Sequence, residues 1–305
     1  MKYVNFEQRT ASRSAGNFLK TSLIITTYNR KDALALVLKS AARQKVLPDE
    51  VLVADDGSND GTGEMVAALA KNFPVPLIHC WQEDCGFRPA AGRNLAVARA
   101  DGDYFVFIDG DMVLPPDFIA THQAWARSDY ITGGKRLFLD ERLTLRLLEH
   151  MEIPDLGFFA RGLSGENRIK AVQYPALAMA ARWFQRDETR ETLLRHGRLT
   201  LHVASCNLAV SCADYFKING FNEEFVGHGL EDHEFCARHL LGGGKIQAPR
   251  FCLAAMHLWH ARSTRPVNPH NRELLWRTIA KKNTVCASGL NNHFPGKVTV
   301  SREMA

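Results

Sequence analysis

Short apolar runs alternate with amphipathic segments along the first 130 residues. Runs rich in β-forming residues predict buried strands at residues 22–25, 51–54, 77–81 and 104–108. The segments between them place apolar residues on one helical face, which predicts helices over residues 31–44, 62–73 and 91–100. A further helix is expected from Pro115-Pro116 to Trp125, because proline is tolerated in a first helical turn. Repeated strand–helix–strand units predict an α/β fold with a Rossmann-like, doubly wound, mostly parallel sheet.

Polar residues follow three of these predicted strands. The carboxyl ends of parallel strands share one edge of a sheet, which is where open α/β sheets bind ligands. The polar residues are Thr27 and Tyr28 after the first strand, Asp55 and Asp56 after the second, and Asp109 and Asp111 after the fourth. Tyr28 can offer a stacking face, and Asp56 can accept a hydrogen bond from a base N–H. Loops are often polar without a ligand, but the three ends together predict a nucleotide pocket.

The most specific of these ends is Asp109-Gly110-Asp111. Glycine lets the backbone bend and approach a ligand closely. Two carboxylates at one strand tip offer hard oxygen ligands for a divalent cation that also carries phosphates. The alternative is a plain turn, since Asp-Gly is a strong turn signal.

Two common phosphate-binding motifs are missing from the sequence. The first predicted strand is not followed by GxGxxG, and the chain contains no GxxxxGK[ST]. These absences argue against a dinucleotide-binding fingerprint and a P-loop ATPase. A metal ion at Asp111 is then the natural partner for a diphosphate.

Composition and charge narrow the class of protein. The chain has 305 residues, of which 46% are hydrophobic and 23% charged, enough for one large domain or two small ones. Its net charge of +5 fits an anionic substrate or a lipid surface, and we expect no nucleic-acid partner. Seven cysteines without a CxxC pair suggest reduced thiols in a cytoplasmic protein. We expect no signal peptide and no membrane-spanning run, which leaves room for peripheral contact with the inner face of the plasma membrane.

Acidic residues mark the start of a second candidate site. A helix is predicted over residues 231–241, with Glu231, Asp232 and Glu234 in its first turn and three glycines after its end. The helix dipole favours acids at this position, which is the structural alternative. Three acids in four residues exceed that need, and Gly227 and Gly229 suit a loop that lies against a ligand.

Two apolar segments are less decisive. The Leu-rich residues 137–148 predict a core helix. His257 and His260 lie in an apolar stretch, where they could be hydrogen-bonded core histidines or metal ligands.

Several short motifs together carry a family resemblance. They are Ile24-Ile25-Thr26-Thr27-Tyr28-Asn29-Arg30, Asp55-Asp56-Gly57-Ser58, Gly92-Arg93-Asn94 and Asp109-Gly110-Asp111. In this order they resemble the family 2 glycosyltransferases of the GT-A fold. The later motifs Gly220-Phe221-Asn222-Glu223 and Gly227-His228-Gly229-Leu230-Glu231-Asp232-His233-Glu234 resemble the catalytic region of β-1,4-galactosyltransferases and chondroitin-type polymerases.

The resemblance implies a role for each matching residue. The nucleotide, expected to be UDP, would be held by Thr27, Tyr28, Arg30, Asp55 or Asp56, and Arg93, with Asp109 near the ribose and the metal. Asp111 would ligate a divalent cation, completed by His260 or alternatively by His257. Oxygen ligands with an imidazole suit Mn²⁺ better than Mg²⁺. Asp232 would be the catalytic base, and Glu231 would contact the acceptor sugar.

The implied activity is an inverting, single-displacement transfer of a hexose or N-acetylhexosamine. The donor would be a UDP-sugar and the acceptor a saccharide or lipid-linked saccharide, in surface polysaccharide or lipopolysaccharide synthesis. The alternatives are a non-catalytic nucleotide-sugar binding module and a sugar nucleotidyltransferase. His228 stands where galactosyltransferases usually have Trp, and Leu230 replaces a Gly, so the resemblance identifies neither sugar.

The same reading divides the chain into four parts. Residues 1–20 form an N-terminal arm, and residues 21–130 form the nucleotide-sugar-binding half of the GT-A domain. Residues 131–270 form the acceptor-binding and catalytic half, and residues 271–305 a C-terminal helical tail.

Overall fold

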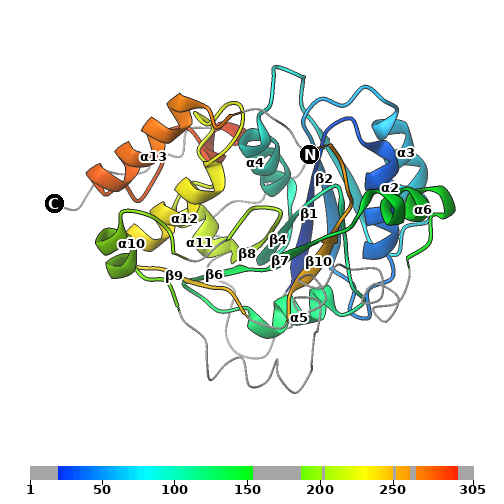
Figure 1. The fold of residues 1–305 in the computed structure, drawn as a ribbon, viewed down its shortest axis with the longest axis horizontal. Coiled ribbons are helices and arrows are strands. Elements are labelled where there is room, and N and C mark those ends of the chain that lie inside the picture. Colours follow the sequence, from blue (N-terminus) through cyan, green and yellow to red (C-terminus); the bar gives the residue numbers. More distant parts are fainter. Residues whose placement is uncertain (1–19, 154–186, 201–202, 250–251, 262–265, 295–305) are drawn as a thin grey trace.

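The structure is a computed structural model that describes residues 20–153, 187–200, 203–249, 252–261 and 266–294 (Figure 1). Apart from Lys20, the expected N-terminal arm lies outside these residues. The strands are β1 (Thr21–Thr27), β2 (Glu50–Asp55), β3 (Leu77–Trp81), β4 (Tyr104–Asp109), β5 (Met112–Val113), β6 (Tyr130–Gly133), β7 (Lys135–Phe138), β8 (Asn207–Ser211), β9 (Lys245–Gln247) and β10 (Ala254–His257). The helices are α2 (Lys31–Ala41), α3 (Thr62–Ala70), α4 (Pro89–Arg99), α5 (Phe118–Trp125), α6 (Glu141–His150), α10 (Arg190–His196), α11 (Cys212–Lys217), α12 (Glu231–Leu241), α13 (Pro269–Lys281) and the 3₁₀ helix η1 (Leu290–His293).

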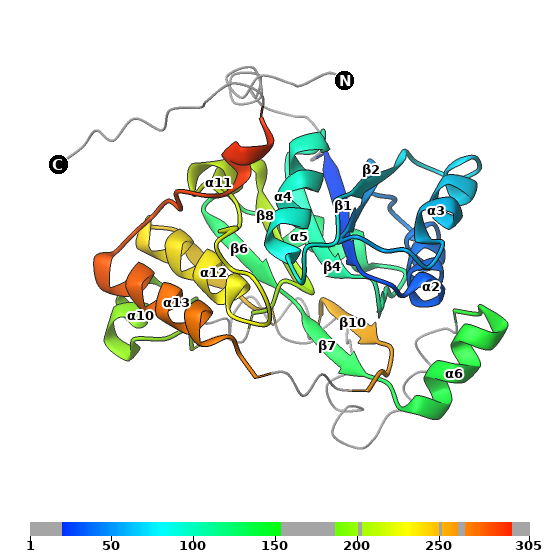
Figure 2. The ribbon, with the colours of Figure 1, turned by 90° about the horizontal axis from the view of Figure 1, so that it is seen from above.

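A seven-stranded sheet forms the centre of the fold, in the order β3-β2-β1-β4-β8-β6-β9. The neighbours among β3, β2, β1 and β4 are parallel, whereas β8 is antiparallel to both β4 and β6. Helices cover both faces: α2 and α3 lie on one side, and α4, α11 and α12 on the other (Figure 2). The predicted doubly wound, mostly parallel α/β sheet is confirmed.

The central strands bury side chains on both faces, which explains their continuous apolar runs. In β1, Leu23 and Ile25 join the core under α2, whereas Ile24 joins the core under α4. In β4, Val106 and Ile108 belong to the core under α2, and Phe105 and Phe107 belong to the core under α4. This packing holds the ends of β1, β2 and β4 in fixed positions at one edge.

A small second sheet, in the order β5-β10-β7, brings late residues to that edge. β10 pairs antiparallel with β5, so that His257 lies opposite Met112. The backbone N–H of Leu258 also donates a hydrogen bond to the carbonyl oxygen of Asp111, at 2.9 Å. Residues far apart in the sequence are thereby fixed next to Asp111.

The core helix predicted over residues 137–148 is wrong at its start. Leu137 lies in β7, where it pairs with Met256 of β10. The helix begins only at Glu141, after Asp140 caps it by accepting a hydrogen bond from the Leu143 N–H. Pairing with a distant strand therefore overrides the local helical pattern. Within the described part of the chain, no helix is both long and apolar enough to cross a membrane.

Candidate active site

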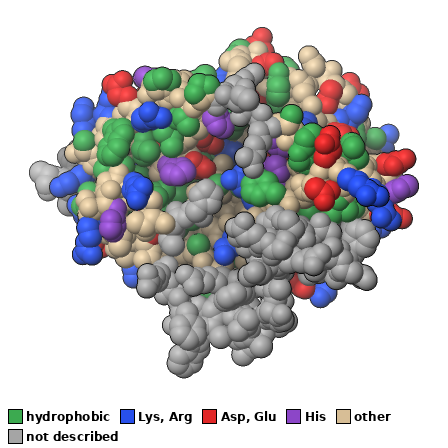
Figure 3. Space-filling model, in the orientation of Figure 1, with side chains coloured by type: hydrophobic (Ala, Val, Ile, Leu, Met, Phe, Trp, Pro, Cys, Tyr) green, Lys and Arg blue, Asp and Glu red, His purple; other side chains and the backbone are tan. Residues whose placement is uncertain are grey.

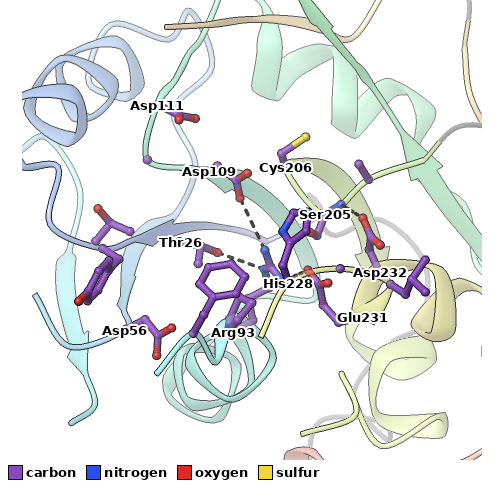
Figure 4. A pocket seen from close by; sticks show the side chains of 18 of the residues that line it. Thr26, Asp56, Arg93, Asp109, Asp111, Ser205, Cys206, His228, Glu231 and Asp232 are labelled. Carbon is purple, nitrogen blue, oxygen red and sulfur yellow. Dashed lines mark hydrogen bonds and ion pairs between the residues drawn. The ribbon is translucent and has the colours of Figure 1, made fainter. Parts of the chain in front are cut away.

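A cavity of about 450 Å³ opens at the carboxyl edge of the central sheet. Its walls come from the ends of β1 and β4, the residues before β8 and the loop that leads into α12 (Figure 4). Histidine, acidic and basic side chains gather near the middle of the face shown in Figure 3. The structure thus brings the first-half strand ends together with the predicted acidic helix start.

Asp111, His257 and His260 form a potential metal site at one side of this cavity. The Nε2 atoms of His257 and His260 lie 3.6 and 3.5 Å from Asp111 Oδ2. The three ligand atoms lie within 4.8 Å of one another. Sequence reasoning left open which histidine is the ligand, and the structure places both beside the carboxylate.

The unsatisfied atoms around Asp111 fit a cation. Among the described residues, Asp111 Oδ1 is buried without a hydrogen-bond partner. Burial raises the pKa of Asp111, and the nearby Arg30 and His260 oppose that rise. Burial, followed by repulsion from His260 and Arg136, lowers the pKa of His257 to about 4. His257 is therefore neutral near pH 7, as a metal ligand must be.

Arg93 of α4 lies at the centre of the cavity and contacts acids from both halves of the chain. Its guanidinium lies 3.6 Å from Asp109 Oδ1 and 3.3 Å from Glu231 Oε1. Its Nε donates a hydrogen bond to Thr26 Oγ1 at 3.1 Å (Figure 4). Burial alone would lower the pKa of Arg93, but the charges of Glu231, Asp109 and Asp232 outweigh it and raise that pKa. Arg93 is thus a permanent cation that ties the β4 end to α12.

Glu231 and Asp232 begin α12, after Leu230 in the left-handed conformation (φ 75°). Burial, repulsion from Asp232 and the weaker opposing charge of Arg93 leave the pKa of Glu231 raised. Burial also acts to raise the pKa of Asp232, but the hydrogen bond from His233 and the charges of His233 and Arg93 lower it overall. Asp232 is therefore ionised near neutral pH and can accept a proton.

The residues expected to hold the nucleotide differ in where they point. Tyr28 is 44% exposed and donates its O–H to Asp84, whereas Thr27 Oγ1 is buried without a partner among the described residues. Asp56 lines the cavity and accepts a hydrogen bond from the Arg88 N–H at 2.6 Å. Asp55 is fully buried and is bonded to His79 and to the Ser58 N–H.

The sequence left open whether Asp55 or Asp56 faces the predicted nucleotide pocket, and the structure shows Asp56 in the cavity wall. Asp55 stabilises the turn after β2, and Asp56 is the member of the pair that faces the cavity. Arg30 also lines the cavity and lies 3.7 Å from Asp111. Gly110 approaches β1 so closely that a Cβ there would lie 3.0 Å from Thr27 Oγ1, which explains the glycine of the Asp-Gly-Asp motif.

Sequence reasoning missed several side chains in the cavity wall: Phe87, Arg136, Ser205, Cys206, His233 and Val267. Arg136 lies in β7, directly before the segment 137–148 for which a helix was predicted, and it carried no functional signal. Ser205 and Cys206 precede β8, and burial raises the pKa of the Cys206 thiol far above its ordinary value, so that it stays protonated. Only His233 stood within a motif that sequence reasoning had singled out.

Comparisons with known proteins identify the family of this chain. Residues 22–188 match the family model described as "Glycosyl transferase family 2", and residues 199–261 match that described as "N-terminal domain of galactosyltransferase". The validoxylamine A glucosyltransferase of Streptomyces hygroscopicus subsp. limoneus is 28% identical over 225 residues, which cover 70% of this chain and 46% of that protein. The chondroitin synthase of Escherichia coli is 26% identical over 235 residues, covering 70% of this chain and 31% of that protein.

A solved structure shares the fold. It is that of S. aureus TarS 1-349 in complex with UDP-GlcNAc, which has a TM-score of 0.59 and 18% identity and covers 87% of this chain and 66% of that one. The chain spans about half the length, or less, of the two curated relatives named above. The expected GT-A fold and the resemblance to chondroitin-type polymerases are confirmed.

Proposed function

Because the chain belongs to glycosyl transferase family 2 and is a glycosyltransferase, we propose that it transfers a hexose or N-acetylhexosamine from a UDP-sugar to a saccharide acceptor, with inversion. One observation carries this proposal: a potential metal site and an ionised carboxylate lie on opposite sides of one cavity. Asp111 lies at one side and Asp232 at the other, with Asp109 and Arg93 between them (Figure 4).

The donor set at Asp111 supports a divalent cation. Ligands about 2.1 Å from one ion lie roughly 3 to 3.5 Å apart. The separations of His257 and His260 from Asp111 Oδ2, 3.6 and 3.5 Å, are close to that range. One carboxylate with two imidazoles favours Mn²⁺ over Mg²⁺. When bound, such an ion supplies Lewis-acid stabilisation of the negative charge on the departing diphosphate.

The chain's own residues supply the remaining chemistry. Asp232 takes the proton of the attacking acceptor hydroxyl, whose oxygen bonds to the sugar C1 as the C1–O bond to the diphosphate breaks. Glu231, held by Arg93, contacts the acceptor sugar beside it. A single displacement with one base inverts the anomeric centre, so that an α-linked donor gives a β-linked product.

The nucleotide side of the proposal rests on the other strand ends. Tyr28 presents an exposed ring for stacking, and Asp56 presents a carboxylate to a base N–H. Thr27 and Arg30 also line the cavity, and Asp109 would lie near the ribose and the metal. The UDP-GlcNAc complex of the TarS protein supports a UDP-sugar donor.

The proposed acceptor is a saccharide or lipid-linked saccharide of a surface polysaccharide or lipopolysaccharide. The similarity to a chondroitin synthase supports a role in polysaccharide synthesis. We also propose that the enzyme works in the cytoplasm, with peripheral contact to the inner face of the plasma membrane. In this proposal residues 21–130 bind the nucleotide sugar and residues 131–270 bind the acceptor, with α13 packed beside α12.

A donor screen tests the function directly. UDP release is measured with UDP-Gal, UDP-GalNAc, UDP-Glc and UDP-GlcNAc, each with Mn²⁺ and with excess chelator. GDP release from GDP-mannose is the control for selectivity toward the uracil nucleobase. Metal-dependent release from one or more UDP-sugars is expected. UDP-sugar binding without turnover, with any acceptor added, would instead indicate a non-catalytic binding module.

A further inference from the structure

His233 forms a close side-chain pair with Asp232 in the cavity wall. Its Nδ1 lies 2.8 Å from Asp232 Oδ1, and its backbone N–H donates to the same oxygen at 2.8 Å. An ionised carboxylate only accepts hydrogen bonds, so Nδ1 carries the hydrogen. Both residues line the cavity. Two donors therefore occupy Oδ1.

The other oxygen of Asp232 is far less engaged. Oδ2 accepts a long hydrogen bond of 3.4 Å from the Ser205 N–H (Figure 4). By holding Oδ1, His233 decides which oxygen remains available to a substrate. In the described part of the chain, His233 Nε2 has no hydrogen-bond partner. Unlike the unpartnered atoms that are buried, this nitrogen is accessible to solvent. With 34% of its side chain exposed, the imidazole can exchange a proton with solvent at Nε2.

The charges around His233 favour its protonated form. Asp232 and Glu231 belong to the same helix, and Glu188 approaches from the bridge to β9. From α4, Arg93 offsets part of the charge of Glu231 and Asp232. The hydrogen bond to Asp232 is the largest influence and raises the pKa of His233, against the opposing effect of burial. The imidazole is thus protonated more readily than an ordinary histidine.

Building on the proposed function, we propose that His233 is the positioning residue of the catalytic base. The neutral imidazole holds Oδ1 and leaves Oδ2 to receive the proton of the acceptor hydroxyl. When His233 is protonated, its positive charge offsets the negative charge of Asp232, so that Asp232 no longer takes the proton and the transfer stops. His233 itself neither gains nor loses a proton during turnover: Asp232 takes the proton from the acceptor and returns it to solvent after the product leaves.

Two substitutions separate the hydrogen bond from the charge. His233→Asn keeps a donor near the position of Nδ1 but cannot titrate, whereas His233→Ala removes both. His270→Gln removes an exposed histidine at the start of α13 and is the matched control. UDP release is measured for the four proteins from about pH 5 to about pH 9, with donor, acceptor and Mn²⁺ saturating at each pH.

In the wild type we expect kcat to fall on the acidic side with a midpoint above 6.5, the ordinary pKa of histidine. His233→Asn should move this midpoint down by more than about one pH unit and keep kcat at high pH within about tenfold. His233→Ala should lower kcat by about tenfold at every pH, with the KM for donor unchanged. His270→Gln should follow the wild type.

Two results would overturn the role of His233. The first is an unmoved midpoint in His233→Asn, which would make the pair purely structural. The second is a loss in His233→Asn as large as that of Asp232→Asn at all pH values, because the imidazole itself would then accept the proton. Absence of UDP release by the wild type would overturn the proposed function, whereas turnover with an unmoved midpoint rejects this inference alone.

Discussion

The buried guanidinium of Arg93 lies 3.3 Å from Glu231, a residue 138 positions later in the chain. This ion pair joins α4, which packs against β1 and β2, to α12, which carries the proposed base. Arg93 also reaches Asp109, so that one cation serves two carboxylates. Arg93 thereby connects the end of β4 to the start of α12 across the cavity.

Arg93→Gln should therefore destabilise the fold as well as abolish turnover. It leaves Asp109 and Glu231 facing each other without the buried cation, and removing one partner of a buried pair costs about 3–5 kcal/mol. The free energy of unfolding from urea titration checks this. Arg93→Gln/Glu231→Gln should be more stable than the sum of the single effects predicts, because only Asp109 is then left without the cation instead of two carboxylates. Additive effects would mean that the pair contributes no coupling.

Elements with strong local sequence signals were predicted at the bounds that the structure shows. Residues 77–81 form β3 and residues 231–241 form α12, as expected, because a short β-rich run and a segment that begins with acids and ends at glycines carry their own local signals. Leu137 did not follow its local pattern, since its strand exists only through pairing with Met256. A pairing of that kind depends on residues more than a hundred positions away and cannot be read from a local window.

The candidate site was predictable only in part for the same reason. The acids at the strand ends were recognisable because parallel strands share an edge. His257 was identified through resemblance alone, as the pairing of β10 with β5 that carries it to Asp111 leaves no local signal. His233 was missed because adjacent helical residues normally point in different directions. At the first turn of α12, however, the Asp232 carboxylate accepts a hydrogen bond from the side chain of His233, the next residue in the chain.

Asp111→Asn should abolish both turnover and metal-dependent UDP binding while leaving the fold intact. Asp111 supplies the carboxylate of the candidate site that it forms with His257 and His260, and a neutral amide is a weaker ligand. Mn²⁺ binding by calorimetry and UDP release check this. Asp117→Asn, which removes an exposed acid paired with Lys45, is the matched control and should behave as the wild type. Wild-type rates in excess chelator would contradict the metal assignment.

Stability should fall as the pH drops from about 6.5 to about 4, in part through His122. Burial lowers the pKa of His122 to about 4, despite its hydrogen bond to Asn207. Above the pKa of the unfolded chain, about 6.5, the residue is neutral in both states and has no effect. Between the two values only the unfolded state binds the proton, which costs about 1.4 kcal/mol of stability per pH unit and about 3 kcal/mol in total.

The variant His122→Gln isolates this contribution. Glutamine can still donate to Asn207 but does not titrate, so its unfolding free energy should decline less steeply than that of the wild type over this window. Urea titrations at several pH values measure both slopes. Carboxylates and other histidines affect both proteins equally. Parallel curves would show that His122 keeps an ordinary pKa in the folded protein.

Asp232→Asn should lower turnover by about 10²–10⁴-fold, because an amide of the same size cannot take the acceptor's proton. Binding of UDP and of Mn²⁺ should be almost unchanged, since Asp232 lies across the cavity from Asp111 and, among the residues that the structure describes, has hydrogen bonds to His233 and Ser205. Calorimetric binding and UDP release measure the two effects separately. A variant that loses nucleotide binding but keeps its rate at saturating donor would place Asp232 in the donor site and move the base to Glu231 or Glu234. The anomeric configuration of the product, read by NMR, gives an independent check: a retained α linkage is incompatible with a single displacement by one base, whichever carboxylate serves.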